Sequence, residues 1–145
     1  MTIRSRVIVL NSKGEVFVVK HRPENKFWAL PGGRLDNGET TRECIIREIQ
    51  EELGVTLKNP ELKFIVENIP VESMEFFFFE ETDTPEAFVE GRGDDHYELA
   101  GQEFVDIEND DIIVMPPFLK GKMKNIKTME GVEYIIETGP KVIYK

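Results

Sequence analysis

Residues 33–55 read GRLDNGETTRECIIREIQEELGV, and this stretch carries most of what the sequence predicts about fold and chemistry. Thr40, followed three residues later by Glu43, is typical of the capping box that begins a helix. Gly54 is the residue type expected just after the last turn of a helix. We therefore predict a helix over residues 41–53.

The predicted helix gathers three acidic side chains on one face. At about 100° per residue, Glu48, Glu51 and Glu52 project within about a third of the helix circumference, and the apolar side chains lie beside them. A glutamate-rich face is also what an ordinary solvated helix presents. The helix alone therefore does not establish a site.

The spacing of the residues around the helix is more specific than the helix itself. The defining positions are, in order, Gly33, Glu39, Arg47-Glu48-Ile49, Glu51-Glu52 and Gly54-Val55. With its lead-in at residues 28–33, this frame resembles the Nudix box, the signature of the Nudix hydrolase family. The resemblance implies an α/β protein with the Nudix fold, a three-layer α/β/α sandwich with a mixed β-sheet.

The resemblance also implies a metal site. The matching glutamates, here Glu48, Glu51 and Glu52, bind divalent metal in the family, often with the backbone carbonyl of the residue before the box glycine, here Gly32. Hard oxygen ligands of this kind suit Mg²⁺, with Mn²⁺ as a substitute. The metal would neutralise phosphate charge and activate a water molecule. We therefore predict a Mg²⁺-dependent pyrophosphohydrolase.

Arg47 and Glu39 are expected to support the metal ligands. Arg47 lies four residues before Glu51, and its guanidinium can hold a carboxylate through two hydrogen bonds, so we predict that it orients a ligand and assists catalysis. A plain stabilising ion pair is the alternative. The glutamate that matches Glu39 usually supports the loop structurally in the family.

The general base is open between the box glutamates, Glu51 and Glu52, and a glutamate of the long loop predicted over residues 83–101. Glu98 precedes Glu103 by five residues, a spacing that resembles family members in which a loop glutamate joins the metal site. We predict Glu98 as the catalytic loop residue ahead of Glu103. An ordinary solvated loop is the alternative.

Two residues are predicted to contact the substrate. Arg22 lies at the exit of a predicted strand, where family members often place a residue that touches phosphate or base, and Gly33 permits close approach of the backbone to a ligand. Phe27 and Trp28 could stack on a base. Because aromatic residues beside a sheet are more often core, we leave both out of the site.

The identity of the substrate is less defined than the reaction. A short chain without an added recognition domain favours a nucleoside triphosphate, cleaved to monophosphate and pyrophosphate. Pro70 resembles the marker proline of ADP-ribose and nucleotide-sugar pyrophosphatases, which are the alternative. A noncatalytic nucleotide-binding Nudix-like module is the alternative of another class, although such modules usually lack box glutamates.

The composition restricts the partners. The 145 residues include 18 Lys and Arg against 28 Asp and Glu, a formal net charge of -10, which argues against nucleic acid polymers and anionic membranes. The first apolar run, residues 7–10, is far shorter than a signal peptide or membrane span needs. We expect a cytoplasmic single domain over residues 1–145 that binds a small-molecule nucleotide. The oligomeric state stays open, a homodimer included.

Outside the box, apolar runs predict a sheet that is buried on both faces. We expect a hairpin and further strands, over residues 6–10, 16–19, 27–30, 62–66, 74–80, 103–106, 132–137 and 142–144. Pro116-Pro117 is typical of the first turn of a second helix. The single cysteine, Cys44, is expected to be core. The strand over residues 132–137 could be a core strand or an interface edge, and we favour the core.

Overall fold

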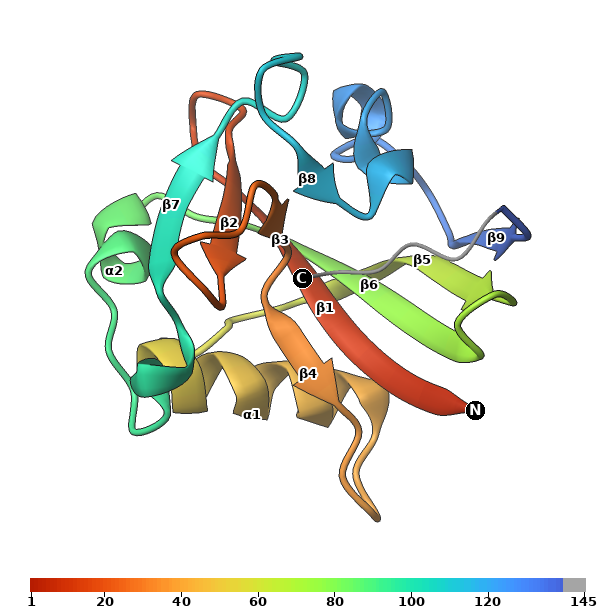
Figure 1. The fold of residues 1–145 in the computed structure, drawn as a ribbon, viewed down its shortest axis with the longest axis horizontal. Coiled ribbons are helices and arrows are strands. Elements are labelled where there is room, and N and C mark those ends of the chain that lie inside the picture. Colours follow the sequence, from red (N-terminus) through yellow and green to blue (C-terminus); the bar gives the residue numbers. More distant parts are fainter. Residues whose placement is uncertain (140–145) are drawn as a thin grey trace.

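The computed structural model describes residues 1–139, in which nine strands form one mixed sheet (Figure 1). The main path across the sheet is β8-β3-β2-β1-β6-β5-β9, while β4 pairs with β1 and β7 pairs with β2. The strands are β1 (Thr2–Leu10), β2 (Val16–Lys20), β3 (Trp28–Ala29), β4 (Gly32–Arg34), β5 (Glu61–Asn68), β6 (Ser73–Glu81), β7 (Gly101–Val105), β8 (Val114–Met115) and β9 (Glu133–Glu137).

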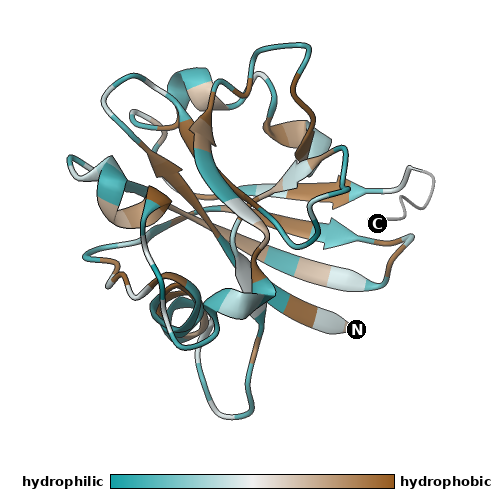
Figure 2. Ribbon diagram, turned by 60° about the vertical axis from the view of Figure 1, so that its left-hand side comes forward, coloured by the Kyte–Doolittle hydropathy of each residue, from teal (hydrophilic) through white to brown (hydrophobic). Residues whose placement is uncertain are grey.

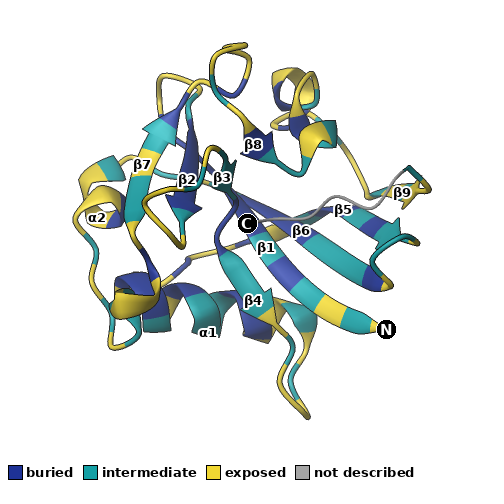
Figure 3. Cartoon of the chain, in the orientation of Figure 1, coloured by how far each residue is buried: buried dark blue, intermediate teal, exposed yellow. Residues whose placement is uncertain are grey.

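The centre of the sheet is the parallel pair of β1 and β6. Val7 is paired with Phe78, and the next residues, Ile8 and Phe79, are paired in turn. The first pair belongs to one core cluster and the second pair to the other, because successive side chains of a strand point to opposite faces. The predicted sheet with two buried faces is confirmed. Its central strands are hydrophobic and largely buried (Figures 2 and 3).

One face of the sheet is covered by the predicted helix, α1 (Thr41–Leu53). Its capping box is present: the Glu43 N–H donates to Thr40 Oγ1 at 3.0 Å, and the Thr40 N–H donates to the Glu43 carboxylate at 2.9 Å. Gly54 ends the helix with a φ of 68°, a left-handed conformation that favours glycine. Buried side chains of α1, including Ile49, join one core cluster.

Two short 3₁₀ helices cover the other face in place of the second α-helix that the sequence predicts. They are η2 (Pro117–Leu119) and η3 (Met123–Asn125), and their buried side chains join the second core cluster. The predicted helix stops after one turn because Lys120 is extended and Gly121 follows with a φ of 87°. Of the helices in the described chain, none is long and apolar enough to cross a bilayer.

The predicted long loop over residues 83–101 contains two short helices, α2 (Pro85–Val89) and η1 (His96–Glu98). Phe88 anchors α2 to the sheet, with its ring centroid 5.4 Å from that of Phe17. The sequence pattern also misses β4 and β8, because strands of two or three residues show no periodicity.

The strand near the C-terminus, β9, is the last strand of the described sheet and pairs in parallel with β5. The expectation of a core strand is correct for one face only. Ile135 packs against the core, whereas Tyr134 and Ile136 are 53% and 57% exposed. The strand predicted at residues 142–144 lies outside the described residues.

Candidate functional site

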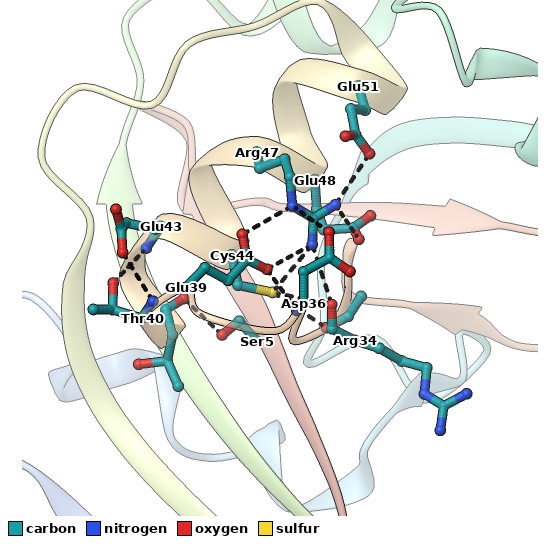
Figure 4. Close-up of polar contacts among 12 residues, drawn as sticks. Ser5, Arg34, Asp36, Glu39, Thr40, Glu43, Cys44, Arg47, Glu48 and Glu51 are labelled. Carbon is teal, nitrogen blue, oxygen red and sulfur yellow. Dashed lines mark hydrogen bonds and ion pairs between the residues drawn. The ribbon is translucent and has the colours of Figure 1, made fainter.

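The short strand β4 brings the box glycines beside the start of α1. Gly33 is paired with Ser5 of β1, and Gly32 with Arg6. Gly32 has a φ of 150°, and a Cβ atom there would lie 2.0 Å from the Ser5 carbonyl oxygen, so only glycine fits. Ser5 Oγ donates to the Thr41 carbonyl oxygen at 2.7 Å and ties β1 to the first turn of α1 (Figure 4).

Gly33 makes room for the carboxylate of Glu48. A Cβ atom at Gly33 would lie 2.4 Å from Glu48 Cδ and 2.5 and 2.7 Å from the two carboxylate oxygens. The sequence predicts Gly33 as a substrate contact, and in the structure the carboxylate of Glu48 lies against this glycine. Contact with substrate therefore stays a prediction, while the effect of the glycine on Glu48 is direct.

Arg47 is the centre of the charged network on α1 (Figure 4). Its guanidinium donates to Glu39 from Nε at 3.0 Å and from Nη2 at 2.7 Å. Nη1 donates to Glu48 at 3.0 Å and to Glu51 at 3.1 Å, and Nη2 also donates to the Arg34 carbonyl oxygen at 3.2 Å. The predicted contact between Arg47 and Glu51 is present, and the same nitrogen, Nη1, also donates a hydrogen bond to Glu48.

Glu39 is the structural partner of Arg47. Its carboxylate also accepts the Asp36 N–H at 2.8 Å, so it connects the loop before α1 to the helix. The hydrogen bonds from Arg47 lower the pKa of the Glu39 carboxyl to about 2. This environment agrees with the supporting role that the sequence predicts. Cys44, beside this network, is buried as expected, and burial raises the pKa of its thiol to about 11.

The Glu39→Gln variant should lose stability at neutral pH but lose less in acid. Because the pKa of Glu39 falls from 4.5 to about 2 on folding, its charge contributes stability above pH 4.5, and that contribution disappears as the pH falls through 2. After allowance for solvent screening, we expect a loss of about 1 kcal/mol in the free energy of unfolding at pH 7. Urea denaturation of both proteins at pH 7 and pH 3 measures the gap, and a gap independent of pH would contradict the assignment.

Glu52 is the most buried carboxylate of the described chain. It is 3% exposed, and its Oε2 atom has no hydrogen-bond partner within residues 1–139. Burial, followed by the neighbouring Glu48 carboxyl, raises the pKa of Glu52 to about 8. Two acidic groups in contact, one of them with an unpaired buried oxygen, form a place where a cation would be stabilised.

The chemistry of Glu48, Glu51 and Glu52 fits the hard oxygen ligands that Mg²⁺ prefers. Among residues 1–139, however, no three acidic, histidine or cysteine side chains already form a group that could hold a metal ion. Arg47 Nη1 holds both Glu48 and Glu51, so two of the three carboxylates have a protein cation as their partner. The donor set fits the metal, and metal binding would compete with this arginine.

A loop after α2 closes on the C-terminal end of α1. The Gly93 N–H donates to the Glu52 carbonyl oxygen at 3.1 Å, and the Asp95 N–H donates to that of Glu51 at 2.8 Å. These carbonyls lack partners inside the helix. A Cβ atom at Gly93 would lie 2.2 Å from the Glu51 carbonyl oxygen, so the approach needs glycine. The loop leads into η1, where the charge of Glu98 contributes to the raised pKa of Glu52.

Gln102 and His96 fasten this loop to β7. Gln102 Nε2 donates to the Phe88 and Gly91 carbonyl oxygens at 2.8 and 2.9 Å. Its Oε1 lies 2.5 Å from His96 Nε2, which donates to it in the corresponding tautomer. Neither side chain has a signal in the sequence, because both contacts join residues whose spatial relation depends on the fold.

Glu103 lies on the opposite side of the sheet from α1. In β7 it is paired with Val18, whose side chain belongs to the core cluster on the face away from α1. Paired residues of neighbouring strands point to the same face, so Glu103 points away from the box. Of the two candidates, Glu98 is therefore the one with a link to the box, because its charge acts on Glu52. Its catalytic role stays a prediction.

A cavity of about 690 Å³ lies beside β4, because its lining residues Arg4 and Arg6 are paired with Arg34 and Gly32 of that strand. Its lining includes Arg22, whose predicted contact with substrate stays a prediction, and Phe27, which we left out of the site from the sequence. Trp28 packs against the core as expected. Arg4 and Arg6 of β1 also line the cavity, and the sequence prediction misses both. The charge of Arg6 acts on the pKa of Glu52, which connects the cavity to the box.

Comparison with known proteins gives a match to the family model described as "NUDIX domain" over residues 2–112. The chain is 38% identical over 65 residues to the uncharacterized Nudix hydrolase YvcI of Bacillus subtilis, a match that covers 43% of this chain and 40% of that protein. It is 43% identical over 61 residues to the RNA pyrophosphohydrolase of Roseobacter denitrificans, covering 41% and 36%. A provisionally named 8-oxo-dGTP diphosphatase of Bacillus subtilis is 50% identical over 48 residues, covering 33% and 32%. These matches span less than half of each relative.

Solved structures resemble most of the described fold. The mutator MutT protein from Bacillus halodurans superposes with a TM-score of 0.65 at 24% identity, covering 92% of this chain and 87% of that chain. An ADP-ribose pyrophosphatase from Streptococcus suis gives a TM-score of 0.69 at 13% identity, covering 94% and 98%. At such identities the similarity establishes the fold alone, and it confirms the predicted fold class.

Proposed function

Because the chain belongs to the Nudix hydrolase family, we propose that it is a metal-dependent pyrophosphohydrolase that cleaves nucleoside triphosphates to monophosphate and pyrophosphate. The observation that carries the proposal is the buried Glu52 carboxylate beside Glu48, with one oxygen unpaired in the described chain. The adjoining arginine-lined cavity supports it, since a protein of net charge -10 needs local cations to accept phosphate.

The box residues have distinct roles in this proposal. Glu48, Glu51 and Glu52, with the carbonyl of Gly32, would hold Mg²⁺, or Mn²⁺ in its place, which when bound neutralises phosphate charge and lowers the pKa of a water molecule. Arg47 orients Glu48 and Glu51 through its Nη1 atom. The buried position of Glu52 keeps bulk water away from its carboxylate, which strengthens its attraction for a cation.

Glu98 is the proposed general base, which takes a proton from the attacking water at its side-chain carboxylate. Its support is its place in η1 near Glu52, and the hydrogen-bond distance of 3.2 Å between its carbonyl oxygen and His21 Nδ1. Glu51 is the competing candidate, and its hydrogen bond from Arg47 favours a ligand role instead. Exposure of Glu98 gives the proton a path to solvent.

Replacing Glu98 with glutamine should lower kcat by about 10²-fold or more, the usual contribution of a general base. Glu103→Gln is the matched control, because it removes the same charge from a residue that points away from α1 and is not among the residues that line the cavity. Steady-state rates across pH with Mg²⁺ check the prediction, and loss of the acidic limb of the profile would distinguish a base from a ligand. A larger effect of Glu103→Gln would reverse the assignment.

A nucleotide panel tests the proposed reaction. Purified protein is incubated with Mg²⁺ and nucleoside triphosphates, including 8-oxo-dGTP, and with ADP-ribose and UDP-glucose, and phosphate is measured after pyrophosphatase or phosphatase is added. A 5′-triphosphorylated oligonucleotide belongs in the panel because several relatives are named RNA pyrophosphohydrolase. We expect triphosphates to be turned over fastest. Binding without turnover of any compound would identify a noncatalytic nucleotide-binding module instead.

A further inference from the structure

The cavity of about 690 Å³ lies on the side of the sheet opposite α1 and is rich in cationic groups. Arg4 and Arg6 alternate in β1 with Ser5, which bonds to α1, so both arginines point to the other face. Arg22 and His21 line the same cavity. Its volume suits a small-molecule site.

The negative charge of the residues that line this cavity does not balance the positive charge of its arginines. Within residues 1–139, Glu75 is the one acidic residue that lines the cavity. Arg6 Nε already donates to its carboxylate at 3.0 Å. Arg4 Nε is buried and has no hydrogen-bond partner among residues 1–139. Burial and then Arg6 lower the pKa of the Arg4 guanidinium, which reflects crowded positive charge. A buried guanidinium donor without an acceptor is rare in proteins, and an anion in the cavity would offset the unbalanced positive charge of this partly buried side chain.

The cavity connects to the candidate catalytic groups from two directions. The positive charge of Arg6 acts on Glu52, and Arg6 Nη1 donates to the Leu30 carbonyl oxygen at 3.0 Å just before the box. His21 lines the cavity and contacts the Glu98 carbonyl oxygen. Two residues that line the cavity are therefore in direct contact with the segment before the box and with the segment that carries Glu98.

We propose that this cavity is an anion subsite, with Arg4 as its main donor, for a phosphate group that lies outside the anhydride that is cleaved. The inference rests on the proposed function and sharpens it. The chain then prefers substrates with a third phosphate over nucleoside diphosphates that end in a neutral sugar. A sugar hydroxyl could accept one hydrogen bond from Arg4, but it brings no charge to offset a partly buried guanidinium, and it makes a weaker bond than a phosphate oxygen does.

The test compares substrates that share a nucleoside and differ in the terminal group, namely ATP with ADP-ribose and UTP with UDP-glucose. The ratio of kcat/KM for triphosphate over sugar nucleotide is measured for the wild type and for Arg4→Gln. We expect this ratio to fall about 10-fold or more, the effect of one charge-assisted hydrogen bond. Arg4→Lys, which keeps the charge without the planar fork, should give an intermediate ratio.

Lys13→Gln is the matched control, because Lys13 is exposed in the turn beyond the far end of β1 and the substitution removes the same charge. A second readout needs no turnover: titration of inorganic tripolyphosphate with EDTA present, followed by amide NMR shifts, should show binding at the cavity that weakens in Arg4→Gln and persists in Lys13→Gln. An equal loss of kcat/KM on both substrates, or unchanged tripolyphosphate binding in Arg4→Gln, would overturn the inference. Arg4-dependent binding without hydrolysis of any nucleotide would refute the proposed function alone.

Discussion

Replacing Glu52 with glutamine should lower kcat at least 10³-fold while the protein remains folded. The substitution removes the charge of the most buried carboxylate of the described chain and keeps the size of the side chain. Loss of one pre-arranged charged group in a site that excludes water commonly lowers rates by this amount. Steady-state kinetics with saturating Mg²⁺ measures the effect. Activity near that of the wild type would exclude Glu52 as a metal ligand.

Thermal unfolding separates the metal-binding role of Glu52 from a structural role. Without metal, the glutamine variant should be about as stable as the wild type at pH 7, because a pKa of about 8 keeps Glu52 mostly protonated, and a neutral amide can donate to Glu48 as the neutral acid does. Addition of Mg²⁺ should raise the melting temperature of the wild type, since a ligand that binds only the folded state stabilises it, but should have much less effect on the variant. Glu86→Gln, on the exposed first turn of α2, controls for the loss of charge.

The parts of the fold and site that the sequence predicts are those set by local periodicity and caps. The capping box, the left-handed Gly54 and the helical spacing of Glu48, Glu51 and Glu52 depend on residues within one or two turns of each other. The burial of β6 on both of its faces follows in the same way, because side chains alternate along a strand and the phenylalanines at residues 76–79 therefore point to both sides of the sheet. Such local contacts can be predicted without knowing which distant segments of the chain pack together.

What the sequence does not predict depends on tertiary pairing. Arg4 and Arg6 look like solvent-exposed charges before an apolar run, and only the pairing of β1 with β4 and β6 shows that they lie in a sheet beside a cavity. The spacing in the sequence does not show which of Glu98 and Glu103 lies closer to the box. The direction of the Glu103 side chain depends on the pairing of Glu103 with Val18. Gly93 gives no sign in the sequence that it approaches the end of a helix.

The Gly33→Ala variant should lose about 10²-fold in kcat with little loss of stability. An added Cβ atom would lie 2.4–2.7 Å from the Glu48 carboxylate, which must then move. The obstructing atoms are the end of a flexible side chain, so the displacement costs little folding free energy. A shift of about 1 Å in a group that positions the reacting centre can nevertheless lower a rate by this factor.

The matched control for this variant is Gly101→Ala in β7. A Cβ atom there would make ordinary contacts, 3.4 Å or more from Trp28 and Lys20. The melting temperatures of both variants should stay close to that of the wild type, and only Gly33→Ala should lose activity and Mg²⁺-dependent stabilisation. Full activity of Gly33→Ala would show that the reaction does not require the Glu48 carboxylate to lie against β4. The assignment of Glu48 as a metal ligand would then have to be abandoned.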